Sequence, residues 1–416
     1  MKYLKEFENH TQYEAFVITD KPNVSYCVAE NEVHYNPLTN ADKWLTFEAL
    51  KDGTFRISRK INYSIDGGAT WTELAANTAT PTITAGNKIM WKAELTPNSS
   101  SGIGTFSSTG NFNAEGNPMS LLFGDNFAGK TDLTGKNYAF YRLFSNCSKL
   151  INAKNLSLPA TTLAQYCYNS MFRGCTSLTT APELPATTLA TYCYSSMFNG
   201  CTSLTTAPVL PATTLANSCY SSMFNGCTSL ATAPVLPATT LAGSCYRQMF
   251  QGCTGLTTAP VLPVTTLVDR CYDSMFSGCT SLTIALELPA TTLANNCYQN
   301  MFNGCTSLTA APQLPATTLA SGCYGYMFQG CTSLTAAPEL PATTLASNCY
   351  NYMFQNCTSL NYIKAMFTTT PNTTYTSNWV SGVAASGTFV KNSAATWTTT
   401  GVNGIPSNWT VETASA

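Results

Sequence analysis

Residues 193–218 read CYSSMFNGCTSLTTAPVLPATTLANS, and this 26-residue unit decides the fold because the chain repeats it. From residue 167 to residue 357 the unit recurs eight times without a change of register. Self-similarity at a period of 20–50 residues is typical of a solenoid, in which each unit buries its apolar side only against its neighbours. A solenoid offers a long repetitive surface instead of one pocket, which favours binding over catalysis.

The apolar residues within one unit predict its local structure. They are spaced i, i+4, i+5, i+8 and i+9, as on one face of a helix: Leu189, Cys193, Tyr194, Met197 and Phe198. Gly200 follows where a helix C-cap is expected, and an extended run over 201–207 ends at Pro208, which has no N–H. The unit is therefore predicted as strand, turn, helix, turn, which gives an α/β solenoid. Because strands pack about 4.8 Å apart and helices roughly 8–10 Å apart, the stack should curve.

Four segments can be separated along the chain. They are an extended, polar and aromatic N-terminal arm (1–40), a small all-β, sandwich-like domain (41–128), the solenoid (129–360) and a C-terminal cap (361–416). The β-domain is indicated by alternating apolar residues between Gly-containing turns. The cap holds three of the six tryptophans and should pack against the last repeat.

Charged residues are scarce, which limits the classes of partner that the chain can bind. Only 10% of residues are charged and the net charge is −1, so no electrostatic field attracts nucleic acid. No stretch is apolar over the 18 or more residues that span a bilayer, so we expect no membrane insertion. The first residues lack the pattern of a secretory signal, and we expect the protein not to enter the secretory route by itself.

Sixteen of the eighteen cysteines follow the repeat. Reduced cysteines stacked in the interior, acting as small buried apolar residues, are the favoured interpretation. Regular disulfide pairing is an alternative, as is zinc, although no C-x-x-C occurs and the two histidines, His10 and His34, lie outside the repeats. We predict no metal and no cofactor.

Positions on the predicted helix flank vary between units. This variation is either drift at solvent-exposed sites or a recognition surface. The candidate ligand surface comprises Arg247, Asp269, Arg270, Asp273, Gln299, Tyr326 and Tyr352.

Signals for catalysis are missing from the sequence. We find no nucleophile constellation, phosphate loop or calcium loop, and we predict that the protein is not an enzyme. Residues 64–71 match the pattern S-x-D-x-G-x-T-W, which resembles the Asp-box of propellers; a single copy predicts one hairpin within the β-domain.

Two resemblances add to this reading. The core Phe-Asn-Gly-Cys-Thr-Ser-Leu-Thr at 198–205 resembles the BspA-like class of leucine-rich repeats, and residues 379–406 resemble the C-terminal end of many such proteins. This implies a leucine-rich-repeat solenoid used for adhesion, often to host surfaces. Residues 7–37 resemble an N-terminal module of head- and tail-fibre proteins of phages that infect gut Bacteroidales, which implies a virion-anchoring arm. The alternative is that this segment forms an ordinary first strand or two of the β-domain. The candidate anchoring residues are Phe7, Tyr13, Phe16, Val24, Tyr26, Val33 and Tyr35.

Taken together, these features predict a non-enzymatic fibre or decoration protein on a phage virion. Its arm would bind a head or tail protein, and its solenoid would bind a protein or glycan on the host bacterial surface. We expect a homo-oligomer, with a trimer favoured because the fibres it resembles are commonly trimeric. A bacterial cell-surface adhesin and a purely structural scaffold are the alternatives.

Overall fold

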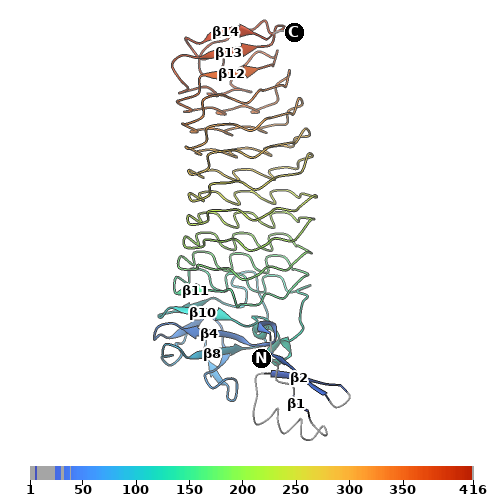
Figure 1. The fold of residues 1–416 in the computed structure, drawn as a ribbon, viewed down its shortest axis with the longest axis vertical. Coiled ribbons are helices and arrows are strands. Elements are labelled where there is room, and N and C mark those ends of the chain that lie inside the picture. Colours follow the sequence, from blue (N-terminus) through green and yellow to red (C-terminus); the bar gives the residue numbers. More distant parts are fainter. Residues whose placement is uncertain (1–4, 7–23, 30–31, 38, 415–416) are drawn as a thin grey trace.

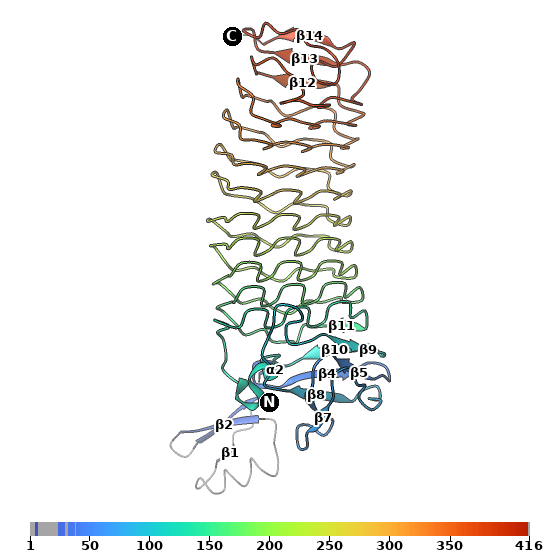
Figure 2. The same cartoon turned by 180° about the vertical axis from the view of Figure 1, so that it is seen from behind.

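The chain forms one elongated column with a strand-rich part at its N-terminal end (Figures 1 and 2). The computed structural model describes residues 5–6, 24–29, 32–37 and 39–414. One continuous cluster of buried apolar side chains runs from Leu45 to Trp409. The solenoid and its two ends therefore share a single core.

The first strands form a small sheet of their own. β1 (Lys5–Glu6), β2 (Val24–Ala29) and β3 (Glu32–Pro37) pair antiparallel in the order β1-β3-β2. The predicted single extended arm is wrong for these segments, because β2 pairs back onto β3. The anchoring candidates divide as follows: Val24 and Tyr26 lie in β2, Val33 and Tyr35 lie in β3, and Phe7, Tyr13 and Phe16 lie outside the described residues.

A six-stranded sheet follows, in the order β11-β10-β4-β8-β6-β7. Its strands are β4 (Leu45–Ala49), β6 (Ile61–Ser64), β7 (Thr72–Leu74), β8 (Lys88–Lys92), β10 (Phe112–Glu115) and β11 (Leu150–Asn152). A separate antiparallel ribbon consists of β5 (Phe55–Ile57) and β9 (Phe106–Ser108). Three short helical turns flank these strands: η1 (Asn40–Asp42), α2 (Ser120–Phe123) and η2 (Gly124–Phe127).

Aromatic side chains join the ribbon to the sheet. The Phe47 ring of β4 lies 5.3 Å from Phe55 and 4.9 Å from Phe106, both on the ribbon, and 4.8 Å from Phe112 of β10. All four side chains are buried. Aromatic pairs stabilise a fold by more than their buried area alone contributes. This cluster therefore holds the ribbon and the sheet together as two layers, in the segment that the sequence predicts to be a sandwich-like domain.

The sheet continues directly into the solenoid. β10 pairs in parallel with β11, and parallel bridges join Asn152 to Thr180 and Thr180 to Thr206 in the next coils. The Phe144 ring contacts Phe47 at 5.7 Å on one side and Phe172 at 5.4 Å on the other. Packing is thus continuous across residue 128, the predicted boundary between the β-domain and the solenoid. The N-terminal sheet covers the first apolar end of the stack, as a solenoid requires.

Each coil is a run of overlapping β-turns. Alternate N–H groups donate three residues back within the coil, as Met197 N does to Tyr194 O at 3.1 Å. The N–H groups between them donate to the next coil, as Phe198 N does to Met223 O at 2.9 Å. A type II turn requires a positive φ at its third residue. Positive φ recurs at every fourth residue of this coil: Tyr192, Ser196 and Gly200.

The predicted helix over 189–198 is therefore wrong, and so is the α/β class; the described coils contain no α-helix. Burial explains the error. Met197 and Phe198 are buried, Asn199 and Gly200 are half-buried, and Cys201 is buried again, so the pattern repeats every four residues. An α-helix repeats every 3.6 residues, and across two turns the two periods place apolar residues at nearly the same positions.

The predictions of a regular strand over 201–207 and of a curved stack are also wrong. The run 201–207 makes isolated bridges, such as Thr180 to Thr206, instead of a ladder. Since no helix widens one side of the coil, nothing forces the stack to bend. The phenylalanine rings of successive coils lie 5.4–5.9 Å apart from Phe172 to Phe302, and Figures 1 and 2 show a nearly straight column.

Identical side chains stack inside the column. The phenylalanine rings from Phe144 to Phe354 are parallel within 10°. The 17 cysteines from Cys147 to Cys357 are all buried and free of disulfides, so the reduced ladders are confirmed there. The second cysteine of each unit donates its S–H to the coil before it, as Cys201 Sγ does to Phe172 O at 3.1 Å.

The C-terminal segment continues the stack with regular strands. β12 (Tyr362–Ala365), β13 (Thr388–Lys391) and β14 (Thr410–Thr413) pair in parallel. Trp379 replaces the ring of the phenylalanine column: it is fully buried and lies 6.1 Å from Phe354. The large indole thus covers the end of the phenylalanine column at the last repeat.

Candidate binding surface

The outward corners of the turns form one long surface, which we call the turn face. In one coil these corners are Asn217-Ser218, Ser221-Ser222 and Asn225-Gly226, of which Ser218 and Ser221 are buried and the other four reach the surface. Residues 26 apart in sequence stand above one another in columns. The surface exists because two inward residues alternate with two outward ones. All seven residues of the candidate ligand surface occupy these outward corners.

Two of the predicted charged residues bind each other. Arg247 Nε donates to Asp273 Oδ2 at 2.9 Å, from one coil to the next. The other carboxylate oxygen of Asp273 accepts from Ser274 Oγ at 2.7 Å, and Asp273 is only 6% exposed. Asp273 is therefore a structural link between coils and is not available to a ligand.

The neighbouring column behaves differently. Asp269 Oδ1 accepts from the backbone N–H of Asn295 in the next coil at 3.2 Å, and Asp269 remains exposed. Arg270 is exposed and takes part in no ion pair within the described residues. The half-buried Gln299 follows Asp273 in its column. Of the four predicted charges, Asp269 and Arg270 are exposed and can interact with solvent or a partner.

Tyr326 and Tyr352 stack in successive coils. Their ring centroids are 4.6 Å apart and their planes are within 8°. Both are half-buried, and partial burial, with Tyr352 alongside, raises the pKa of Tyr326. They lie at least two coils from Arg247 and Asp273, so the seven candidates share one face without converging on one point.

A larger tyrosine cluster at the other end of the turn face was missed from the sequence. Tyr138, Tyr166 and Tyr192 stack at 4.7 and 4.9 Å with planes within 5°. Tyr141 packs edge-on against Tyr138 at 5.7 Å, and the Arg142 guanidinium lies 4.8 Å from the Tyr141 ring. All four tyrosines are half-buried. The available signal was tyrosine at 166 and 192, one period apart, in an outward column.

Amide side chains line a third column. Asn225 Nδ2 donates to Gln251 Oε1 at 2.8 Å, and Asn303 Nδ2 donates to Gln329 Oε1 at 2.6 Å, each between successive coils. These residues are half-buried, so part of their hydrogen-bonding capacity faces solvent. Aromatic edges, amides and hydroxyls with few charges are suited to a neutral polyol or a polar protein surface.

The Asp-box segment forms a hairpin, as predicted. β6 and β7 pair antiparallel, and the Asp66 carboxylate accepts from Thr70 N at 2.9 Å. Hydrogen bonds, first from Ser64 and then from Thr70, hold the pKa of Asp66 well below its usual value. The hairpin is thus closed by its own carboxylate.

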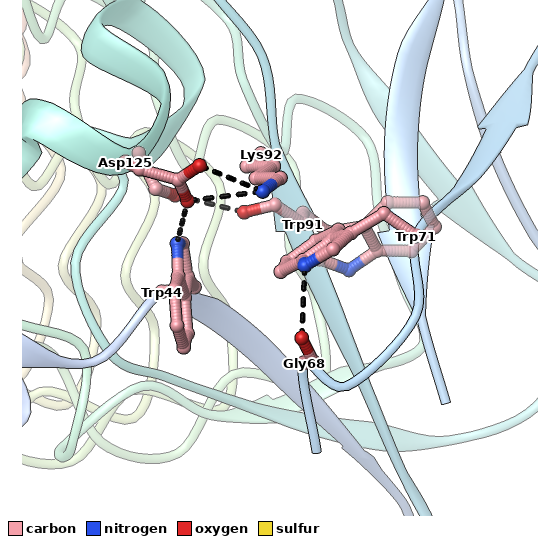
Figure 3. A network of polar contacts seen from close by, with 7 residues as sticks. Trp44, Gly68, Trp71, Trp91, Lys92 and Asp125 are labelled. Atoms are coloured by element: carbon pink, nitrogen blue, oxygen red, sulfur yellow. Dashed lines mark hydrogen bonds and ion pairs between the residues drawn. The ribbon is translucent and has the colours of Figure 1, made fainter. Parts of the chain in front are cut away.

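The hairpin is also tied to the sheet. Figure 3 shows Trp71 Nε1 reaching the Gly68 carbonyl, at 3.1 Å, and Trp44 Nε1 reaching Asp125, at 3.1 Å. Lys92 lies 4.3 Å above the Trp71 ring and binds Asp125 at 2.8 Å. Because both indole N–H groups are satisfied within the protein, this network holds the hairpin in place.

The described residues contain no group of three or more His, Cys, Asp or Glu placed to hold a metal ion. Burial raises the pKa of Cys253 and of Cys305 to about 12, so these thiols are protonated near neutral pH and are poor nucleophiles. In the same part of the chain no helix is long and apolar enough to cross a membrane.

A family model described as a BspA-type leucine-rich repeat region of six copies matches residues 137–257 and 244–378. No curated protein matches the chain, and no solved structure does. The matched residues comprise the solenoid coils and the start of the C-terminal cap, which is more than half of the 416 residues.

Proposed function

The chain belongs to the BspA-type leucine-rich repeat family, and on that premise we propose that it is a non-enzymatic adhesion protein that binds through its turn face. The observation that carries the proposal is the pair of half-buried tyrosine stacks, Tyr138–Tyr166–Tyr192 and Tyr326–Tyr352, at two levels of one face. Rigid aromatic groups supply much of the binding energy in polar recognition surfaces.

We infer that the ligand is a glycan or a protein on a bacterial host surface. The turn face offers ring edges, amides and hydroxyls, and Arg270 adds one exposed cation. With a net charge of −1 the chain lacks the basic surface that nucleic acid needs. Hydrogen bonding and aromatic contact, instead of charge, would then give the affinity.

The test replaces tyrosines by a residue that the same column already accepts. Tyr192 has a positive φ, and Asn296 and Asn348 hold the same corner with a positive φ in other coils, so Tyr192→Asn keeps the turn. We expect Tyr166→Asn with Tyr192→Asn to weaken binding on glycan arrays and to host cells about ten-fold. The control is Gln313→Glu, on another edge of the column, where Glu183 and Glu339 hold the same position in other coils.

Two results would decide against this function. Unchanged binding in the tyrosine variants would remove the turn face from the interaction. No binding of the full chain to glycans or to host cells would favour a purely structural scaffold.

We further propose that the protein is a fibre or decoration protein of a phage virion, held by its N-terminal segment on a head or tail protein. This rests on the resemblance of residues 7–37 to fibre modules, and a homo-trimer is the assembly it suggests. Deleting residues 1–40 should release the protein from purified particles, as measured by immunoblotting of banded virions. Retention of the truncated chain would refute the anchoring role. The family match alone favours the second candidate, a bacterial cell-surface adhesin, for which the protein would co-purify with cell envelopes.

A further inference from the structure

A second surface of the column carries an apolar stripe that the turn-face proposal does not use. Each unit contains the segment Ala-Pro-x-Leu-Pro or a close variant, and we call the surface formed by these segments the proline edge. The position x along this edge holds Glu183, Val209, Val235, Val261, Glu287, Gln313 and Glu339. The three valines, in successive coils, are 77%, 80% and 78% exposed. Within residues 167–360 the one other exposed large apolar side chain is Ile284, and such a run of apolar side chains is typical of an interaction site.

Grooves accompany the valines. One of about 440 Å³ lies between successive coils and is lined by Pro182, Pro185, Pro208, Val209 and neighbours. Another of about 320 Å³ lies between the coils of Val235 and Val261, again with proline walls. The proline edge is therefore a series of apolar ridges with grooves between coils, which is the relief that side chains of another element can enter.

The repeat distance favours one kind of element. Parallel bridges join Thr180 to Thr206 and Thr232 to Thr258 beside the proline edge, so successive coils lie about 4.8 Å apart there. An α-helix rises about 5.4 Å per turn, so a helix lying along the column presents one side chain per turn close to each groove and drifts by only about 0.6 Å per coil. An extended strand repeats its side chains on one face at about 6.6 Å and would lose register within a few coils.

Charge argues against a second copy as the occupant. Glu183 and Glu287 bound the valine run at its two ends and are exposed, and neither takes part in an ion pair within the described residues. Two copies that paired their valine runs in register would place these carboxylates opposite each other in either direction, which is repulsive. A partner with cationic residues at both ends of an apolar stripe is complementary.

We propose that the proline edge from residue 183 to residue 287 binds an amphipathic α-helix of a protein partner, with apolar residues one turn apart and Lys or Arg at both ends. The four coil steps between the two glutamates cover about 19 Å, which a helix of about 13 residues spans. The apolar side chains enter the grooves between coils, and the terminal cations meet Glu183 and Glu287. This is helix-in-groove recognition, independent of the turn face.

The test uses the full chain and a synthetic helical peptide of that length, with Leu at i, i+4, i+7 and i+11 and Lys at both ends, followed by fluorescence anisotropy. A scrambled peptide of the same composition is the reference. The variant is Val235→Glu, which the fold accepts because Glu183 and Glu339 hold the same position in other coils. The matched control is Gln313→Glu, on the same edge but outside the valine run.

We expect the patterned peptide to bind at least ten-fold tighter than the scrambled one. Val235→Glu should weaken this binding about ten-fold, while Gln313→Glu and the turn-face variant Tyr192→Asn leave it unchanged. Equal binding of the two peptides, or binding insensitive to Val235→Glu, would overturn the proposal. A wild-type oligomer that Val235→Glu dissociates in sedimentation experiments would overturn it as well, because a second copy would then occupy the stripe.

Discussion

Replacing Phe250 by alanine tests the central physical idea, that stability resides in contacts between neighbouring coils. Phe250 is fully buried and stacks between Phe224 at 5.6 Å and Phe276 at 5.7 Å. Phe→Ala in a core costs about 3–5 kcal/mol, and the two lost ring pairs add about 0.5–1.5 kcal/mol each. Because these contributions overlap, we expect a loss of about 4–6 kcal/mol in the free energy of unfolding.

The location of the loss is as informative as its size. In a solenoid each coil is supported by its two neighbours, so the damage should stay near residues 224–276. The two ends keep their own covers, the N-terminal sheet and the Trp379 cap. Urea unfolding followed by circular dichroism measures the free energy, and hydrogen-exchange mass spectrometry locates the coils that lose protection.

Val235→Gln serves as the control, because Val235 is 80% exposed and Gln313 holds the same position elsewhere. Its effect should stay within about 0.5 kcal/mol. A loss below about 2 kcal/mol for Phe250→Ala, or protection lost equally along the whole column, would refute the idea that coils support each other locally.

Three further predictions follow from single contacts. Cys253 is buried and its pKa is raised to about 12, so a thiol reagent at pH 8 should label it only after denaturation, and labelling in the native protein would contradict the ladder. Arg247→Ala leaves Asp273 without its 2.9 Å partner and should cost about 1 kcal/mol, with Arg247→Ala/Asp273→Ser costing less than the two single changes added together in thermal unfolding. The pKa of Asp66 is lowered in the folded state. The ionised carboxylate therefore contributes fully to the free energy of unfolding above the unfolded-state pKa of about 4, and this contribution is lost as the pH falls through the lower folded-state pKa. An NMR titration in which the Asp66 carboxylate protonates at or above its ordinary pKa would contradict this.

The sequence alone predicted the repeat, the solenoid and the reduced cysteine ladders, because the 26-residue period is explicit in residues such as Cys201 and Phe198. It failed on the local backbone. Leu189, Cys193 and Met197 are four residues apart, and a run of turns with a four-residue period is indistinguishable from a helix over so short a length. The distinguishing fact is a positive φ at residues such as Ser196, which residue type does not reveal.

The candidate surface was predicted in part for a similar reason. The outward corners were recognised as variable positions, so Arg247, Tyr326 and Tyr352 do lie on one face. Which of these residues bind each other depends on column neighbours 26 residues apart. Reading Arg247 against Asp273, or Tyr166 against Tyr192, at that separation would have shown the ion pair and the tyrosine stack.

Because each coil meets its neighbours through the same set of stacked rings, thiols and turns, one coil can replace another. Removing or adding a multiple of 26 residues between the N-terminal sheet and the Trp379 cap would leave the stacked rings, thiols and turns at the remaining junctions of the same kind. The reach of the molecule is therefore adjustable in fixed steps of roughly one coil spacing, about 5 Å. A change in the number of 26-residue units is sufficient to lengthen or shorten the column without a new kind of buried contact.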